Sequence, residues 1–388
     1  MLFFINCIFI NLSISAQTLE ESFLNPADSV KPWVFWFWIN GNISQEGITK
    51  DLEAMKEVGI NGVIWMEVSG PWWAPQGQVV AGSDEWHEAM QWAISELDRL
   101  DMEMALSVDF GYGSGGPHIT PDISMQEIVW SKTKVKGGKT VELMVEKPEI
   151  DKTLEPVWLR PGEEMNPAVT DAVEAIDSYR DIALYAVPTA SLQQSSIIPG
   201  YQKEEIAAKL RNVPGLRNVE KDPLMAFDGR GWKTHLPPLD FNTGLSALNK
   251  DEVIYLTEQM EENGNLAWDA PQGDWTIFRM GYASNYHITR PSPYLAVGLE
   301  SDRLHPRGIE THFEHRLKPI IEAAGDKAGR TLKYIHIDSW EAGGQNWSKG
   351  FAEEFKKRRG YDITPWLPVL TGHAVDTQIM TERFLWDM

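Results

Sequence analysis

The residues with the clearest potential for chemistry lie together in the stretch 333–341, which reads KYIHIDSWE. Its first half is apolar or aromatic and follows a polar turn, which predicts a buried β-strand. Alternation along a strand places His336 and Asp338 on one face. Two carboxylates, Asp338 and Glu341, close the stretch with Trp340 between them. Such a pair can divide proton donation and charge stabilisation, although acids at a strand end can equally be solvated or cap the next helix.

Three further predicted strands also end at polar residues. Strands expected over 34–39, 62–68 and 103–110 are separated by segments with helical periodicity, and this β-α-β-α-β order implies parallel strands with right-handed crossovers. In a β/α barrel the carboxyl ends of such strands converge on one mouth, where active sites lie. An open doubly wound sheet prefers strands that are apolar on both faces. The four polar strand ends expected at the mouth are Asn40, Glu67, Asp109 and Asp338.

The expected architecture is α/β, with a (β/α)8-type TIM barrel that is incomplete in this chain and carries an inserted β-rich domain. From 131 to 301 the α/β rhythm is replaced by short β-like runs between turns rich in Pro, Gly and Asp. This region is too long for a loop. The expected division is a signal peptide over 1–16, the first part of the barrel over 17–130, the inserted β-rich domain over 131–301 and the barrel continued over 302–388.

A glycine-rich loop follows Asp109 and reads GYGSGGPH over 111–118. It contains neither of the glycine motifs that bind phosphate groups. We interpret it as backbone that bends closely around a ligand or a neighbouring loop, with His118 at its end as a candidate binding residue. Thr120 followed by Pro121 then predicts the start of a helix. Elsewhere in the chain, helices are predicted to begin at Ser44, Ser83 and Ser348, and one helix is expected near 308–324.

The N-terminus is typical of a signal peptide, although it has no Lys or Arg near its start. Residues 1–16 form an apolar run that ends in Ile-Ser-Ala, and this run is too short to span a membrane. It contains Cys7, the only cysteine, so the mature chain would have no disulfide. No other apolar run is long enough to cross a bilayer. We expect export to the periplasm or the extracellular space.

Charge and aromatic content narrow the class of partner. The net charge is −21 and the longest basic run is 356–359, which argues against nucleic acid or an acidic membrane as a partner. The 17 Trp residues offer flat apolar faces that suit the C–H faces of sugars. Carboxylates and aromatic rings at a barrel mouth fit hydrolysis of an oligo- or polysaccharide, which requires one protonated and one ionised carboxyl group. The alternative is a non-catalytic carbohydrate-binding protein that lacks a complete acid/base pair.

Three blocks of sequence resemble family 106 of the glycoside hydrolases, the α-L-rhamnosidases and their relatives. The blocks are PWVFWFWINGNISQEGITKDLEAMKEVGINGV, GSGGPHITPDISMQEIVWSKTKVKGG and YIHIDSWEAGGQNWSKGFAEEFKKRRGYDITPWLPVLTG. The resemblance covers the chain from about residue 31 onward and is weakest in the β-rich region. It implies a β/α-barrel catalytic domain, inverting hydrolysis in a single displacement, calcium near the sugar and substrates among rhamnose-containing glycans.

The resemblance also suggests roles for individual residues. The family's catalytic-acid region falls on the DSWE motif, that is, on Asp338 and Glu341. We expect Glu341 to be the general acid and Asp338 its orienting partner, with the catalytic base on a later strand beyond residue 388. A barrel glycosidase acting on a different sugar is a second alternative. The expected substrate-binding residues are Asn40, Glu67, Asp109, His118, His336 and Trp340.

Overall fold

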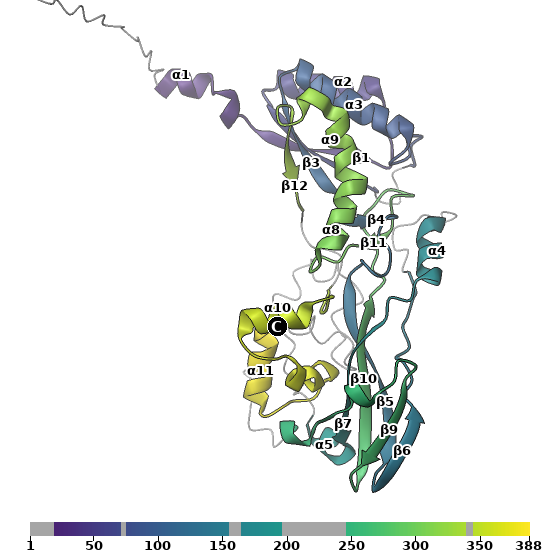
Figure 1. Ribbon diagram of the computed structural model, residues 1–388. Coiled ribbons are helices and arrows are strands. Elements are labelled where there is room, and N and C mark those ends of the chain that lie inside the picture. The colour runs from purple at the N-terminus through teal and green to yellow at the C-terminus, as the bar shows by residue number, and fades with distance from the viewer. Residues whose placement is uncertain (1–18, 71–74, 155–163, 196–245, 339–343) are drawn as a thin grey trace, which may run out of the picture.

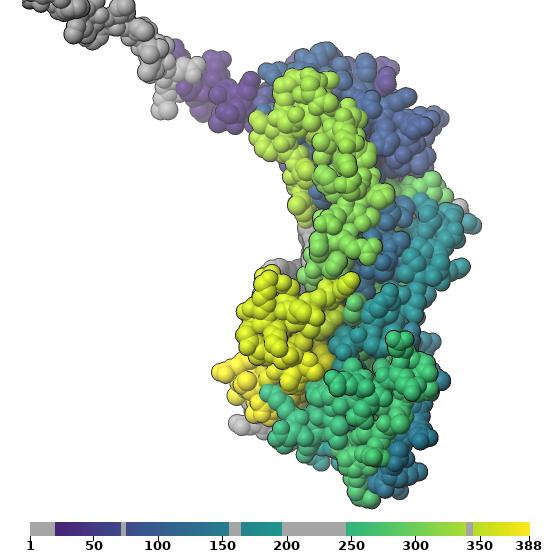
Figure 2. Space-filling model, viewed as in Figure 1, coloured from purple at the N-terminus to yellow at the C-terminus, as the bar shows by residue number. Residues whose placement is uncertain are grey.

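The computed structural model of the chain describes residues 19–70, 75–154, 164–195, 246–338 and 344–388. The predicted signal peptide therefore lies outside the described residues, as do the DSWE residues from 339 onward. The fold has two parts, a parallel sheet covered by helices and an antiparallel sheet with a second group of helices (Figure 1). In space-filling view the molecule is elongated and narrows between the parts (Figure 2). No helix within the described residues is long and apolar enough to cross a membrane.

The parallel sheet contains the four strands that the sequence predicts. The strand order is β1-β2-β3-β12, and all three pairings are parallel. This confirms the α/β class and the expected adjacency, but the four strands do not close into a barrel. The strands are β1 Trp33–Ile39, β2 Gly62–Val68, β3 Glu103–Phe110 and β12 Leu332–His336.

The helices beside this sheet begin at side-chain caps. In α2 (Gln45–Glu57) the Ser44 hydroxyl accepts a hydrogen bond from the Gly47 N–H, and in α3 (Asp84–Arg99) Ser83 accepts one from Trp86. Such caps satisfy backbone donors that the first helical turn leaves free. The apolar faces of both helices then pack on the sheet in one core with Trp36, Trp38, Trp65 and Leu106.

A third helical segment completes this cover. It comprises α8 (Pro306–His312), the π-helical turn η5 (Phe313–Leu317) and α9 (Lys318–Ala324), where the sequence predicts one helix. Leu317 and Ile320 join the same core, and α9 packs against α3. The π-helical turn adds a residue to the helical register, as such turns commonly do at functional sites.

The second part is built on an antiparallel sheet of order β5-β10-β7-β8. A separate antiparallel pair, β6 with β9, packs against that sheet in a core that includes Leu184 of β7 and Ile277 of β10. Strands β6, β7 and β10 occupy runs where short β-strands are predicted. The bounds of the strands in this part are β5 Gln126–Lys136, β6 Lys139–Met144, β7 Arg180–Pro188, β8 Ile254–Tyr255, β9 Asn265–Ala270 and β10 Asp274–Ser284. The shorter elements are α1 Leu19–Leu24, β4 Gly115–Gly116, α4 Pro167–Ala175, α5 Thr189–Gln194 and β11 Leu299–Glu300.

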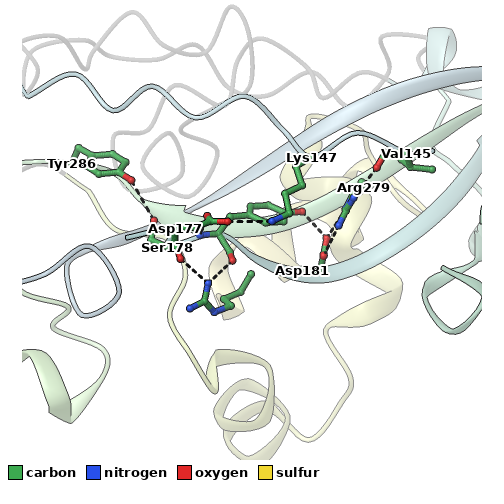
Figure 3. A network of polar contacts seen from close by, with 9 residues as sticks. Val145, Lys147, Asp177, Ser178, Asp181, Arg279 and Tyr286 are labelled. Carbon is green, nitrogen blue, oxygen red and sulfur yellow. Dashed lines mark hydrogen bonds and ion pairs between the residues drawn. The ribbon is translucent and has the colours of Figure 1, made fainter. Parts of the chain in front are cut away.

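A polar network joins β7 to β10 (Figure 3). Arg279 donates hydrogen bonds from Nε and Nη2 to the two oxygens of Asp181, both at 2.8 Å, and from Nη1 to the Val145 carbonyl at 2.7 Å. The Tyr179 hydroxyl donates to the same Asp181 carboxylate at 2.7 Å. The Arg279 side chain is only 3% exposed, so this two-pronged pair satisfies a buried charge and fixes the register of the two strands.

The C-terminal segment packs on the antiparallel sheet. It comprises α10 (Phe351–Arg359), the 3-10 helix η7 (Thr364–Thr371) and α11 (Gln378–Asp387), all beside the second sheet in Figure 1. Phe355, Trp366 and Phe384 share a core with Tyr185 and Phe278 of that sheet. The expected continuation of the barrel over 302–388 therefore does not describe residues 344–388. Their aromatic side chains bury against the apolar face of the second sheet.

Two local predictions in the middle and C-terminal part of the chain are wrong. Thr120 begins a turn, in which its hydroxyl donates to the Asp122 carboxylate at 2.6 Å, and β5 then starts at Gln126. The alternating side chains of 126–136 favour a strand over the predicted helix. The β-rich part thus starts before residue 131. Ser348, which the sequence suggests as a helix cap, donates its hydroxyl hydrogen to Asp302, and α10 starts after Gly350.

The parallel sheet has two open edges and an open inner face within the described residues. β1 and β12 each pair with one strand only, and a cavity of about 530 Å³ lies beside β1. On the inner face, the Phe35 and Tyr334 side chains are 52% and 48% exposed. Unpaired strand edges and exposed apolar side chains promote association between molecules.

We therefore expect residues 17–388, prepared alone, to self-associate. Size-exclusion chromatography with light scattering should show oligomers or aggregate, because association covers the aromatic face. The double variant Phe35→Ser/Tyr334→Ser should shift the sample toward monomer, whereas Trp92→Ser, which alters an exposed aromatic on α3, should not. A monodisperse wild-type monomer that unfolds cooperatively would contradict this expectation.

Candidate functional site

Two of the predicted acids meet at the carboxyl end of the parallel sheet. Asp109 ends β3 and Asp338 follows β12, the strand beside it. The Asp109 carboxylate is 1% exposed and accepts a hydrogen bond from Ser114 at 2.6 Å. Burial raises the pKa of Asp109; the Ser114 hydroxyl, the Arg303 charge and the Asp338 backbone oppose this rise, and the Asp338 charge adds to it. The structure thus brings both acids to one end of the sheet, as the sequence predicts.

His336 lies on the same side of β12 as Asp338. Its Nε2 atom is 3.7 Å from Asp338 Oδ2, and both side chains are 25% exposed. Its ring makes an edge contact with Phe35 of β1, at 5.9 Å between ring centroids. Trp33 and Tyr334 contact each other in the same way at 5.4 Å. The inner face of the curved sheet therefore combines aromatic side chains with an imidazole and two carboxylates.

Glu67 lies on the opposite, helix-covered face of the sheet. It is paired in register with Trp38, and its Oε2 accepts a hydrogen bond from Trp86 of α3 at 2.7 Å. Arg316 of η5 is also buried there, with its guanidinium 3.9 Å from the centroid of the Phe110 ring. Burial raises the pKa of Glu67 to about 7 against the opposing charge of Arg316. The expected binding role of Glu67 at the mouth therefore does not fit its position beneath a helix.

Asn40 and His118 are engaged with their own surroundings. Asn40 has a positive φ of 53°, and its side-chain oxygen accepts a hydrogen bond from the Gly70 N–H at 2.7 Å. His118 is hydrogen-bonded to His312 at 3.0 Å. Because His312 Nε2 lies 2.7 Å from the Val108 carbonyl and must donate to it, its Nδ1 accepts from His118. Burial lowers the pKa of His118 to about 3, so this ring is neutral and structural contacts occupy it.

Two charged residues that the sequence does not single out complete the site. Glu300 of β11 is fully buried beneath the glycine-rich loop, and Arg303 donates a hydrogen bond to its Oε2 at 3.2 Å. A Cβ atom on Gly115 would lie 2.1 Å from the Leu299 carbonyl oxygen, so this position requires glycine. The loop therefore bends around a neighbouring segment. The sequence gives little signal for Glu300, because it lies 191 positions after Asp109 in the chain.

Burial raises the pKa of Glu300 to about 7; Arg303 opposes this rise and the nearby Asp109 adds to it. Between pH 4.5 and 7 the folded chain then binds more protons at this site than the unfolded chain, so its stability falls as pH rises. We expect Glu300→Gln to become more stable relative to wild type over this interval, by roughly 3 kcal/mol. Urea unfolding at pH 4.5, 6 and 8 measures the difference.

Glu300→Asp is the matched control, because it keeps a carboxyl group at this position and should retain most of the pH dependence. The buried histidines titrate in all three proteins and cancel in the comparison. Parallel stability curves for wild type and Glu300→Gln would show that Glu300 does not titrate in this range.

The expected calcium ion finds no complete site among the described residues. They contain no group of three or more His, Cys, Asp or Glu side chains arranged to hold a metal ion. Asp109 and Asp338 are two carboxylates, whereas calcium takes about six to eight oxygen ligands. Calcium binding therefore stays a prediction. Glu341 and Trp340, the remaining predicted site residues, lie outside the described residues.

An acidic end of a parallel sheet, with aromatic rings on the same face and a glycine-rich loop beside it, suits the chemistry of a glycoside hydrolase. The family model for α-L-rhamnosidases, glycoside hydrolase family 106, matches residues 24–388. The chain therefore belongs to glycoside hydrolase family 106, and the expected resemblance is confirmed.

Two similar proteins are longer than this chain. It is 31% identical over 380 residues to a protein of Formosa agariphila named "Putative beta-glucuronidase", covering 97% of this chain and 28% of that protein. Its fold matches the structure of a rhamnosidase from Novosphingobium sp. PP1Y with a TM-score of 0.72 and 23% identity, covering 96% of this chain and 44% of the other. The chain thus spans less than half of either relative.

Proposed function

We propose that this chain forms part of an exported glycosidase that hydrolyses terminal α-L-rhamnosyl linkages in glycans with inversion of configuration. The observation that carries the proposal is the placement of Asp109 and Asp338 at the ends of neighbouring parallel strands, within a chain that belongs to a rhamnosidase family. The DSWE motif continues directly from this end of the sheet. A complete (β/α)8 barrel with an inserted β-rich domain is part of the proposal.

The proposed chemistry divides the work between two carboxyl groups. Glu341 protonates the glycosidic oxygen as the bond to the sugar breaks. Asp338 remains ionised, orients the sugar hydroxyls and keeps the proton on Glu341 through its negative charge. His336 and the Phe35 ring lie on the inner face of the parallel sheet beside Asp338. A base about 6.5–9.5 Å from Glu341 activates the attacking water.

The test is turnover of aryl glycosides with NMR detection of the first product anomer. The 388-residue chain is assayed first, and then the chain extended by any coding sequence that follows codon 388. Release of rhamnose with inverted anomeric configuration is the expected result. Product with retained configuration would overturn the inverting mechanism. Binding of rhamnosides without turnover by the extended protein would favour a carbohydrate-binding role.

A second candidate substrate is a β-glucuronoside, and the name of the Formosa agariphila relative favours it. The same panel therefore includes an aryl β-D-glucuronide. Hydrolysis of the glucuronide with no activity on the rhamnoside would replace the proposed sugar while keeping the glycosidase class. Calcium binding stays a prediction, measured by metal analysis of the purified protein before and after dialysis against a chelator.

A further inference from the structure

We propose that a cavity of about 210 Å³ on the second part of the molecule binds an anionic sugar unit, such as a uronic acid residue of an acidic glycan. This inference relies on the proposed function only for the ligand being a glycan. The cavity lies beside the start of β5, the start of β7 and the end of β10, close to the start of α8. At roughly 30 Å³ per water it has room for about seven water molecules, which is close to the space that one sugar ring needs.

The pairing of β7 with β10 determines which side chains form the floor of the cavity. Arg180 of β7 lies directly opposite Tyr282 of β10, so both side chains project from the same face of the sheet. Tyr282 is partly buried and lines the cavity, where its ring offers an apolar surface for the C–H face of a sugar. Strand β10 thus supplies an aromatic ring on which a sugar can stack, and β7 supplies a cation beside that ring.

Three cationic side chains line the cavity, namely Arg180, Arg307 and Lys349. Arg180 uses Nη1 for the carbonyls of Asp177 and Tyr179, and within the described residues its other guanidinium nitrogens have no partner. Lys349 likewise has no hydrogen bond or ion pair within that part of the chain. The side chain of Arg307 is 62% exposed. These donors are therefore available to a ligand.

The two acids of the cavity neutralise only part of the charge of the three cations. Asp302 accepts a hydrogen bond from Ser348 at 2.6 Å and another from Gln345, and burial raises its pKa. Asp122 forms an ion pair with Arg307 at 3.7 Å, whereas Arg180 and Lys349 form no ion pair within the described residues. His305 accepts from the Arg307 N–H through Nδ1, so its Nε2 carries a proton and donates. The cavity keeps a positive balance.

Two buried polar side chains can form hydrogen bonds with the hydroxyl groups of a sugar, in addition to the charge contacts. Ser178 is 3% exposed and Gln126 is 2% exposed, and both line the cavity. The amide nitrogen of Gln126 donates to the carbonyls of Pro121 and Ser124, whereas its Oε1 atom has no partner within the described residues. A buried acceptor without a partner is costly, and a sugar hydroxyl would satisfy it.

The charge of the whole protein makes this cavity distinctive. A net charge of −21 repels acidic polysaccharides at long range. A local group of cations with an adjacent aromatic ring is therefore a specific arrangement, which binds an anionic unit where the rest of the surface does not. A neutral sugar can stack on the Tyr282 ring and form hydrogen bonds through its hydroxyl groups, but it supplies no negative charge to pair with the cations.

Calorimetric titration of the 388-residue chain with three disaccharides tests the proposal. They end in glucuronic acid, in glucose 6-sulfate and in glucose. We expect the glucuronate to bind at least tenfold more tightly than the glucose compound. Arg307→Gln and Lys349→Gln should each weaken its binding by about tenfold, since a hydrogen bond to a charged group is lost. Lys50→Gln, which alters a lysine on α2, is the matched control and should bind like wild type.

Circular dichroism verifies that the variants are folded. Equal affinity for the charged and neutral compounds, or binding that neither variant weakens, would overturn the proposal, and so would the absence of binding. Tight binding of the sulfate compound, weakened in the same way by both variants, also supports the anion site. The compound that binds more tightly then shows whether the site prefers a carboxylate or a sulfate. The readout is binding, so a failure here leaves rhamnoside hydrolysis to be judged by its own assay.

Discussion

Replacing Glu341 with Gln is expected to lower turnover of a natural rhamnoside by about 10²- to 10⁴-fold, the usual contribution of general acid catalysis. Gln keeps the shape of the side chain and removes the proton that the leaving oxygen needs. An acid that donates near neutral pH needs a pKa above its ordinary value of about 4.3. The structure supports this role indirectly, because Asp338 and Asp109 are close together and place negative charge at the end of the sheet from which Glu341 follows.

The control for this prediction is the substrate. An aryl rhamnoside with a good leaving group needs little protonation and should lose much less activity in Glu341→Gln. Steady-state kinetics on both substrates, with the longest active form of the protein, provides the measurement. Equal losses on the two substrates would assign the proton to another group, and Asp338→Asn would then be the next variant to assay.

The second large effect concerns stability and comes from Arg316. We expect Arg316→Ala to destabilise the folded chain by about 3–5 kcal/mol, the usual cost of leaving a buried charge uncompensated, because Arg316 and Glu67 are both buried and their charges interact. The side chain packs against Trp65, Trp86 and Phe110, with its guanidinium 3.9–5.3 Å from the ring centroids. Removing it leaves a cavity and a buried carboxyl, Glu67, without a cation.

The pH dependence of this loss follows from Glu67. Burial raises its pKa to about 7, so the group is largely protonated in the folded state at pH 5 and ionised at pH 8. The destabilisation by Arg316→Ala should therefore be larger at pH 8 than at pH 5. Urea unfolding at the two pH values measures it.

The matched controls separate charge from packing. Arg316→Met keeps most of the side-chain volume, and the double variant Arg316→Met/Glu67→Gln also removes the uncompensated carboxyl. The double variant should recover most of the stability at pH 8. A loss below about 1 kcal/mol for Arg316→Ala at pH 8 would contradict the prediction, because that is typical of an exposed site.

Much of the candidate site could be predicted because strand ends are local features. The alternation in 333–338 correctly places His336 and Asp338 on one face, and the β-α-β-α-β order makes Asp109 and Asp338 neighbours. The same reasoning fails for Glu67. Alternation gives only the relative phase of side chains along a strand, whereas the helices decide which face is covered. Once α3 packs on the face that carries Trp38, Glu67 is buried with it.

The sequence by itself determined the elements with a local cause. The caps at Ser44 and Ser83, the parallel strands and the family follow from patterns within short stretches. Only the tertiary structure decided which distant charges meet. The charges of Glu300 and Asp109 interact because β11 pairs with β4 within the glycine-rich loop, and those of Arg316 and Glu67 interact because η5 packs over the sheet. These contacts join residues far apart in the chain and depend on packing energy summed over the whole core, which no local pattern records.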